Sequence, residues 1–524
     1  MTQIIGLSNL KLGSENYENK KNSCLEIGCK QATDICELTA KEEADILESA
    51  GLLINDFISR NILQYIEPNF HDMIKAETTS LLIKQLSLFG EYYENFNEII
   101  ESNIDNAFKI FYTHILPRRS YPYSFIRKPV NTKKMKDKIE YLKAIPQPEQ
   151  RTDEWYLFRQ KYITASSAHH IFGTQSAKNS FIYNKCQPIN LDKYNNVSVE
   201  TPMHWGVKYE PVSVLWYEYE YKLYVEDFGC LPHSTLPYLA ASPDGIVTDE
   251  TSTRFGRMLE IKNIYNREIT GIPKKEYWIQ MQLQMEVCDL NECDFLETRF
   301  IEYEDEDEFN SDGAFNLSND DMYKGIIIQF LKNNSPHYEY PPFNITKEDF
   351  IKWEEDIMEK NANLTWIKNI YWKLETISCV LVLRNKKWFD KAKDELEAIW
   401  NIIQVEKNSD YSHRAPKKRI KKITGRKCLL NTNAIKLDPS FNNTNLSILE
   451  PDLVCEPKTG ASPGADTGAD AGADTGADTG ADAMSKKKCT TKTKNKRKGK
   501  KQQETESNII SICTESLDDS IISP

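Results

Sequence analysis

The sequence has no apolar run long enough to cross a lipid bilayer. Its longest apolar runs, such as GIIIQFL and CVLVL, are far shorter than the roughly 20 residues that a membrane-spanning helix needs. The first residues, MTQIIGLSNLKLG, lack the charged segment and long apolar core of a secretory signal. We therefore expect a soluble intracellular protein with no membrane partner.

A disulfide framework is also missing. The 12 cysteines are scattered without a repeating frame, which is typical of free thiols in a reducing compartment. Only Cys24, Cys29 and Cys36 cluster, and no fourth cysteine or histidine follows them at the spacing of a metal site. This spacing gives little support to a zinc or iron–sulfur centre.

The chain has no overall positive charge, since its formal net charge is −12. A general affinity for nucleic acid is therefore not expected. The charges are nevertheless segregated: acidic residues gather in EYEDEDEF (302–309), and basic residues gather in RAPKKRIKKITGRK (414–427) and SKKKCTTKTKNKRKGKK (485–501). An acidic active site in a chain with separate basic segments would suit a metal-dependent nuclease.

Three acids and one amine between positions 210 and 262 form the most informative pattern. Glu210 lies in HWGVKYEP, Asp244 in ASPDG, and Glu260 and Lys262 flank Ile261 in MLEIKN. The alternation in MLEIKN predicts a β-strand with Glu260 and Lys262 on one face, about 7 Å apart along the backbone. Burying these charges is costly without partners, which Asp244, Glu210 and a divalent metal would supply. The alternative is a surface salt bridge on an exposed strand.

The rest of the chain divides by pattern into regions of different kinds. Before the pattern just described, the sequence predicts helices followed by a basic, proline-punctuated linker, KPVNTKKMKDKIEYLKAIPQPEQ; after it come further helices and a GAD repeat too poor in apolar residues to form a core. The lysine-rich segment beyond the repeat is a candidate for nuclear import or nucleic-acid binding, or a solvated tail. The predicted regions are a helical N-terminal extension (1–145), a core (146–335), a helical C-terminal region (336–405) and a mostly disordered basic tail (406–524).

Within the core, the periodicity predicts alternating helices and strands. TDEWYLFRQK, capped by Thr152 or Asp153, and EPVSVLWYEYEYK are expected to be helices. LYVEDFGCLPH, PYLAASPDGIV and RMLEIKN read as strands, followed by the helix KEYWIQMQLQMEVCDL and the strand CDFLETRFIEY. The apolar helix at 277–288 carries three glutamines, which need buried partners or a ligand.

Taken together, the motifs resemble those of a known family. EWYLFRQKYITASSAHHIFG, HWGVKYEP, ASPDG, LEIKN and EYWIQMQLQMEV occur in the order found in lambda-type exonucleases, the YqaJ-like viral recombinases of the PD-(D/E)xK nuclease superfamily. The resemblance covers about 150–305 and implies an α/β fold with a restriction-endonuclease-like core, a mixed sheet flanked by helices. Large DNA viruses encode such proteins with long, unrelated flanks, and this chain looks like one of them.

The resemblance also implies an activity and roles for particular residues. It implies 5′-to-3′ digestion of double-stranded DNA with two Mg²⁺ ions, for which Mn²⁺ may substitute. Asp244, Glu260 and the backbone carbonyl of Ile261 would bind metal, Glu210 would complete the second metal site, and Lys262 would orient or activate the attacking water. Chemistry agrees, because two cations about 4 Å apart can activate water and stabilise the leaving oxygen, and Mg²⁺ prefers hard oxygen ligands.

Further roles follow from the same resemblance. Arg159 and Ser166 match residues that hold the terminal 5′-phosphate, and a guanidinium group suits a phosphate. Ser166 or Ser167 is expected to open the next helix, whose amides would add to an anion site. Tyr277 and Gln280 would lie beside the metals and the scissile phosphate. His169 and His170 are not required as ligands.

The expected partners are double-stranded DNA ends and a single-strand annealing protein, in viral recombination, repair or genome processing in the host cytoplasm or nucleus. Phage members of the family form ring-shaped trimers, but the long N-terminal extension and the basic tail depart from that compact form. Two alternatives remain open. One is an endonuclease or alkaline-nuclease-like enzyme of the same superfamily, and the other is a catalytically inactive DNA-binding protein.

Overall fold

The computed structural model describes residues 38–88, 97–126, 131–148, 150, 152–191, 201–333 and 335–416. The cysteine cluster, the GAD repeat and the lysine-rich segment at 485–501 lie outside these residues. None of the helices within the described ranges is both long and apolar enough to span a membrane.

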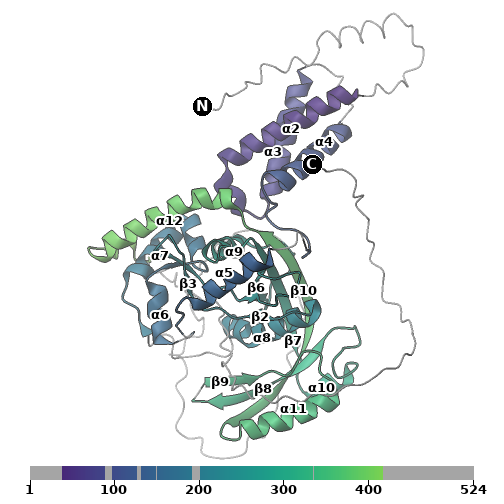
Figure 1. Ribbon diagram of the computed structural model, residues 1–524, viewed down its shortest axis with the longest axis vertical. Coiled ribbons are helices and arrows are strands. Elements are labelled where there is room, and N and C mark those ends of the chain that lie inside the picture. Colours follow the sequence, from purple (N-terminus) through teal and green to yellow (C-terminus); the bar gives the residue numbers. More distant parts are fainter. Residues whose placement is uncertain are drawn as a thin grey trace, which may run out of the picture. The chain divides into compact units, whose positions relative to one another are not determined.

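A mixed β-sheet forms the centre of the described structure (Figure 1). Strands β6 and β7 are parallel, and every other neighbouring pair in this sheet is antiparallel. A smaller sheet has the order β1 (Ile163–Thr164), β4 (Leu239–Ala241), β3 (Leu231–Pro232). In spatial order the main sheet consists of β2 (Val225–Glu226), β5 (Gly245–Val247), β6 (Met258–Asn263), β7 (Glu292–Glu302), β10 (Thr365–Leu383), β8 (Lys324–Lys332) and β9 (Ser335–Glu339).

Helices cover both faces of this sheet. Helix α9 (Lys275–Val287) connects β6 to β7 and shares one buried cluster with Met258 and Phe295. Helix α8 (Pro202–Tyr221) shares another with Leu259 and Ile261. Successive strand residues point to opposite faces, so the two clusters lie on the two sides of β6. The predicted fold class, a mixed sheet flanked by helices, is confirmed.

The predicted core elements are present, with changed limits. Helix α6 (Asp153–Gln160) begins after Thr152, whose side chain accepts a hydrogen bond from the Trp155 amide. Helix α8 starts well before EPVSVLWYEYEYK, because Thr201 caps it and Pro202 occupies its first turn. Glu210 therefore lies within a helix. The remaining elements here are η4 (Ala168–Phe172), α7 (Gln175–Cys186) and α10 (Glu306–Ser311).

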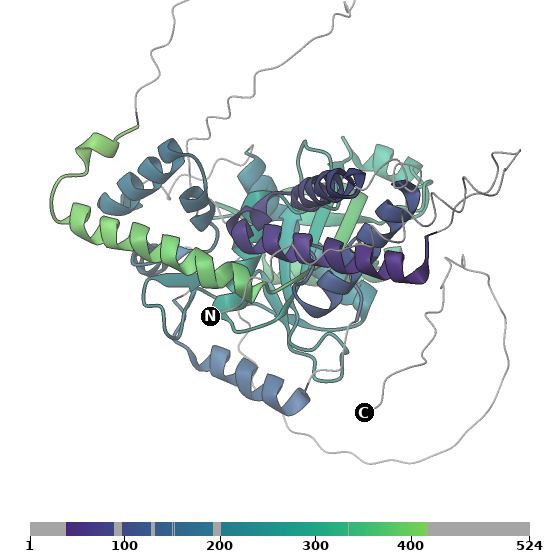
Figure 2. The same cartoon turned by 90° about the horizontal axis from the view of Figure 1, so that it is seen from above.

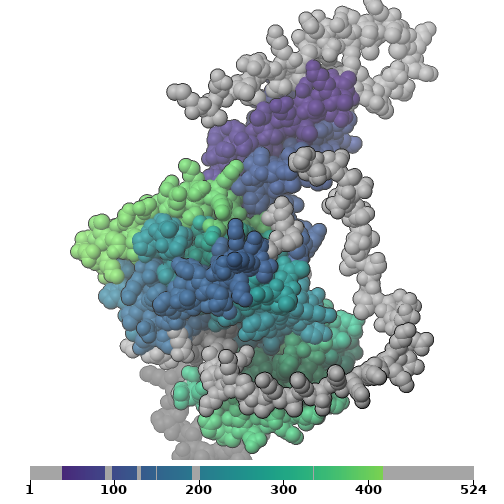
Figure 3. Space-filling model, in the orientation of Figure 1, coloured from purple at the N-terminus to yellow at the C-terminus, as the bar shows by residue number. Residues whose placement is uncertain are grey.

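The prediction of a helical region at 336–405 is only partly right. Helices α11 (Lys347–Lys360) and α12 (Lys386–Lys407) are present, and α12 packs along α7 (Figure 3). A short 3₁₀ turn, η6 (Ser412–Arg414), follows them. The intervening residues 365–383, however, form β10, the longest strand of the main sheet. Their β-branched and aromatic side chains favour a strand, and the sheet therefore continues past the expected core boundary at 335.

The described part of the N-terminal extension is helical, as predicted. Its elements are α2 (Ala40–Arg60), η2 (Ile62–Ile66), α3 (Phe70–Ser87), α4 (Asn97–His114) and α5 (Thr132–Ala144). Helices α2, α3 and α4 pack against one another (Figure 2). Helix α5 occupies much of the expected linker, where Asn131 caps it by accepting a hydrogen bond from the Lys134 amide.

The extension is bonded to the sheet and to α9. The amides of Tyr121 and Ser124 donate to the carbonyls of Leu381 and Cys379 on β10, at 2.9 and 3.0 Å. The Trp278 indole of α9 donates to the Arg119 carbonyl at 2.8 Å. Residues 119–124, which precede the core, therefore form hydrogen bonds with β10 and with the first half of α9.

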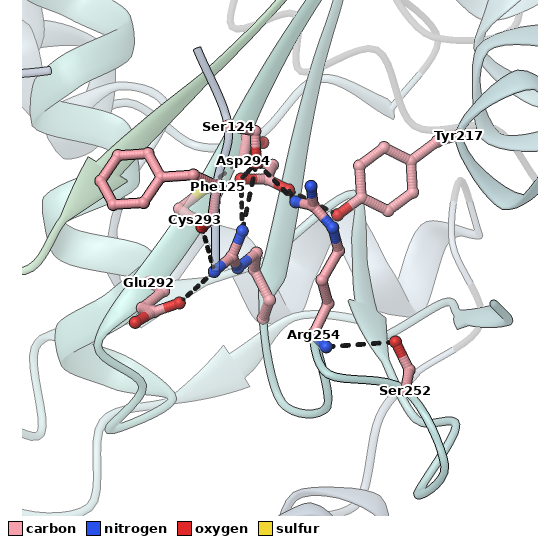
Figure 4. Close-up of polar contacts among 9 residues, drawn as sticks. Ser124, Phe125, Tyr217, Ser252, Arg254, Glu292, Cys293 and Asp294 are labelled. Carbon is pink, nitrogen blue, oxygen red and sulfur yellow. Dashed lines mark hydrogen bonds and ion pairs between the residues drawn. The ribbon is translucent and has the colours of Figure 1, made fainter. Parts of the chain in front are cut away.

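A buried ionic cluster joins the extension to the hairpin between β5 and β6 (Figure 4). Asp294 on β7 is fully buried and accepts hydrogen bonds from Arg254, Arg257, Ser124 and Tyr217. Both arginines lie in the hairpin that connects β5 to β6. This hairpin therefore neutralises a carboxylate in the middle of the sheet.

We expect Asp294→Ala to lower the free energy of unfolding by about 3–5 kcal/mol, because it would leave two buried guanidinium groups without their main counter-charge. Denaturation by urea measures the change. The control is Asp56→Ala, which breaks an exposed ion pair with Arg60 and should cost no more than about 1 kcal/mol. Equal losses for the two variants would contradict the assigned role of the cluster.

Candidate active site

Glu260 and Lys262 project from the same face of β6, as the alternation predicted. The Lys262 ammonium donates to Glu260 Oε1, and Gln284 Nε2 on α9 donates to Glu260 Oε2 at 2.7 Å. Glu260 is 0% exposed, and β6 lies inside the sheet between β5 and β7. The alternative of a salt bridge on an exposed strand is therefore wrong.

Asp244 lies at the bend between β4 and β5 and reaches across to β6. Its Oδ2 accepts a hydrogen bond from the Ile261 amide at 2.7 Å. The residue is partly exposed, but burial of its carboxyl raises its pKa well above the usual range, and repulsion from Glu260 and Glu210 adds to this shift while Lys262 opposes it. The Ile261 side chain is buried on the α8 side, so only its backbone can take part in the site.

Glu210 reaches the site from α8 and is 5% exposed. Repulsion from Glu210 contributes to the raised pKa of Asp244. Asn263 fixes α8 against the end of β6: its Nδ2 donates to the Gly206 carbonyl at 3.0 Å, and its Oδ1 accepts from Ser213 at 2.7 Å. The structure thus brings Glu210, Asp244, Glu260 and Lys262 together.

The donor set has the chemistry that Mg²⁺ requires. Glu260 and Asp244 both act on the Lys262 ammonium, and Glu260 and Glu210 both raise the pKa of Asp244. Hard carboxylate oxygens are the protein ligands that Mg²⁺ prefers. Within the described residues, no group of three or more His, Cys, Asp or Glu side chains is already arranged to hold a metal ion.

Arg159 and Ser166 also come together. Arg159 Nη2 donates to Ser166 Oγ at 3.2 Å, and the guanidinium lies over the Trp155 ring, 4.3 Å from its centroid. The following helix is the short 3₁₀ turn η4, which opens after Ser167 and packs against α9. His169 Nδ1 pairs with the Ser166 carbonyl at 2.9 Å.

The three glutamines of α9 have different environments. Gln282 bonds to the backbone of Leu383 and Asn385 at 2.9 and 2.7 Å, away from Glu260. Gln284 contacts Glu260 directly and also donates to the Ser242 carbonyl at 2.9 Å. Gln280, predicted as catalytic, is 8% exposed and makes no side-chain hydrogen bond among the described residues. Tyr277 lies near Lys262, whose ammonium is 5.3 Å from the centroid of its ring.

Sequence reasoning missed two contributors. It singled out Tyr277 and Gln280 on α9, whereas Gln284 is the glutamine that contacts Glu260. The two glutamines share one face of the helix, and only their positions along its axis distinguish them. Glu297 on β7 is 1% exposed, is in register with Lys262 and pairs with Arg267. Burial raises the pKa of Glu297, while Arg267 opposes the shift. The sequence did carry a signal for this residue, because CDFLETRF places Glu297 at a position of the predicted strand that faces inward.

Geometry defines a class of site: acids and a lysine on a central strand, with a helix-borne glutamate and a nearby arginine–serine pair. Comparison adds a likeness, because residues 154–291 match the model of the YqaJ-like viral recombinase domain. The matched region includes Arg159, Glu210, Asp244, Glu260 and Lys262.

A curated relative comes from a large DNA virus. An uncharacterized protein of Acanthamoeba polyphaga mimivirus is 30% identical over 335 residues, which is 56% of this chain and 58% of that protein. The chain thus spans less than two thirds of that relative. This likeness agrees with the expected origin in a large DNA virus.

Solved structures show more distant likeness. An alkaline exonuclease from Laribacter hongkongensis is 18% identical with a TM-score of 0.29, covering 50% of this chain and 97% of its own. A phage-related exonuclease from Haemophilus somnus is 14% identical with a TM-score of 0.26, covering 47% of this chain and 94% of its own.

We expect Asp244→Asn to stabilise the metal-free protein at pH 8. The raised pKa means that the folded protein holds this proton more tightly than the unfolded chain does, so ionised Asp244 weakens the fold. This penalty grows as the pH rises toward the folded pKa and is absent below the ordinary aspartate pKa of about 3.9. Urea denaturation across this pH range measures the effect.

The control is Asp249→Asn. Hydrogen bonds from Thr251 lower the pKa of Asp249, so this substitution should destabilise the protein at pH 8. An Asp244→Asn variant that is less stable than the unsubstituted protein at pH 8 would contradict the assigned crowding of carboxylates.

Proposed function

We propose that the chain is a metal-dependent nuclease that hydrolyses phosphodiester bonds of double-stranded DNA from 5′ ends. The supporting observation is the convergence of Glu210, Asp244, Glu260 and Lys262 within the YqaJ-like domain. A buried excess of negative charge is costly unless cations neutralise it. Phosphodiester hydrolysis requires cations at the same place, beside the attacking and leaving oxygens.

Two Mg²⁺ ions bound by these carboxylates would supply an activated water and stabilise the leaving oxygen. The protein's part lies in Lys262. Burial disfavours its charge, but Glu260 and Asp244 outweigh that effect and raise its pKa. Neutralising the carboxylates would weaken the attraction that holds this proton, so that the ammonium could release it to solvent. The resulting neutral amine, positioned on β6, would then orient the attacking water and take a proton from it.

The proposed 5′ specificity depends on Arg159 and Ser166. The guanidinium is fixed by the Trp155 ring and by Ser166, so its geometry is set before DNA binds. A terminal phosphate carries more charge than an internal one and can accept paired hydrogen bonds from an arginine. We also propose that the protein acts with a single-strand annealing protein in viral recombination, repair or genome processing. Assembly into a homo-oligomer and a location in the host cytoplasm or nucleus stay predictions.

We expect Lys262→Ala to lower the cleavage rate by about 10²–10⁴-fold, the usual contribution of a positioned proton-transfer group. Glu260→Gln should also lower the rate strongly, because it removes the charge of a proposed metal ligand. End-labelled duplex DNA with Mg²⁺ or Mn²⁺ provides the assay, and thermal denaturation monitors folding. The control is Glu375→Gln, which removes a partly exposed carboxylate on β10 that pairs with Arg299. Cleavage by folded Lys262→Ala at the normal rate would exclude this active site.

Arg159→Ala should remove the preference for a 5′-phosphate. Charged hydrogen bonds of about 1.5–3 kcal/mol predict a loss of roughly tenfold to a hundredfold on phosphorylated ends, with little change on 5′-hydroxyl ends. Arg118→Ala is the control, because Arg118 also lies over an aromatic ring, that of Tyr112. Equal losses on both end types would contradict the role, and cleavage of closed circles by the unsubstituted protein would favour an endonuclease.

A further inference from the structure

An exposed aromatic surface lies next to the end of β6. Tyr265 follows Lys262 by three positions and is 56% exposed. Its ring meets that of Trp205 on α8 nearly at right angles, with the centroids 5.2 Å apart. Met203, in the first turn of α8, is 48% exposed. Large apolar side chains are therefore held in solvent beside the catalytic strand.

This surface is held in a fixed position relative to Lys262. The Asn263 side chain binds the Gly206 carbonyl and so ties α8 to β6 between the two aromatic rings. The Ile264 amide donates to the Thr298 carbonyl on β7 at 2.7 Å, which fixes the backbone just before Tyr265. Tyr265 therefore cannot move independently of the catalytic strand.

The other contacts of Trp205 leave Tyr265 as the accessible ring. The Lys208 ammonium lies 4.7 Å from the centroid of Trp205, and Tyr209 packs against the same indole at 4.6 Å. Lys208 is in turn paired with Glu302. These contacts cover part of the indole, and the indole in turn supports the Tyr265 ring. The other side of the Tyr265 ring stays exposed to solvent.

We propose that Tyr265, supported by Trp205, is a stacking platform for an unpaired base next to the phosphate that is cut. This inference rests on the proposed nuclease function. Aromatic side chains bind nucleobases by stacking without regard to sequence, and a base inside a duplex is already stacked on both sides and not free to bind. The platform therefore selects a strand end that has separated from its complement, and holds it at the end of β6.

The experiment measures binding of the full chain to 5′-phosphorylated duplexes with a short unpaired 5′ end, with Ca²⁺ in place of Mg²⁺. Each duplex is prepared with normal bases and with abasic positions in the unpaired end. Tyr265→Ala should weaken binding of the normal DNA roughly tenfold, as loss of one base–aromatic stack does. Tyr265→Phe keeps the ring face and should bind like the unsubstituted protein.

The matched control is Tyr224→Ala, which removes another exposed tyrosine, 59% exposed, next to β2. It should bind both DNAs like the unsubstituted protein. The decisive result is whether the two changes act on the same contact. The unsubstituted protein should bind abasic DNA roughly tenfold more weakly than normal DNA, whereas Tyr265→Ala should bind the two DNAs equally well. A merely structural tyrosine would weaken both DNAs equally.

The possible outcomes separate the two proposals. If the unsubstituted protein cuts DNA and Tyr265→Ala binds normal DNA equally well, the platform is excluded and the nuclease stands. If Tyr265→Ala loses the same factor on normal and abasic DNA, the platform is also excluded. If the unsubstituted protein neither binds nor cuts DNA with any of these metals, both proposals fail.

Discussion

An excess of negative charge at the end of β6 is the constraint on which the rest of the site depends. Glu260 is buried with one oxygen on Lys262 and the other on Gln284, and Asp244 is held by the Ile261 amide. Each carboxylate is thus satisfied by hydrogen bonds, but their mutual repulsion is not balanced. Folding alone would favour fewer acids here, so a cation-dependent function is the simplest reason for keeping them.

Much of this arrangement could be predicted from the sequence because strands encode their faces locally. MLEIKN alternates, so Glu260 and Lys262 had to share a face, and the neighbouring apolar residues Met258, Leu259 and Ile261 indicated burial. The proline and glycine that flank Asp244 favour the bend found there. These signals act over a few residues and do not depend on the rest of the fold.

Other features could not be predicted because they depend on distant partners. Asp294 is paired with arginines 37 and 40 residues away, and nothing local marks Arg254 and Arg257 as buried. Gln280 and Gln284 are four residues apart and share one face of α9, so the choice between them depends on where α9 lies along its axis relative to Glu260. Residues 365–383 were expected to be helical, but the neighbouring strands β7 and β8 provide the hydrogen-bond partners that make β10 a strand.

The placement of α9 connects the N-terminal extension to the chemistry. Gln284 and Tyr277 face the site, while Trp278 is fully buried, contacts Tyr65 of η2 at 5.8 Å between ring centroids and donates to the Arg119 carbonyl. Lys275, in the first turn of the same helix, pairs with Glu67 at 2.7 Å. A helix bonded along one side to the extension and along the other to Glu260 cannot shift without disturbing both. The extension is therefore part of the framework that holds Gln284 against the Glu260 carboxylate, rather than a separate module attached to a complete core.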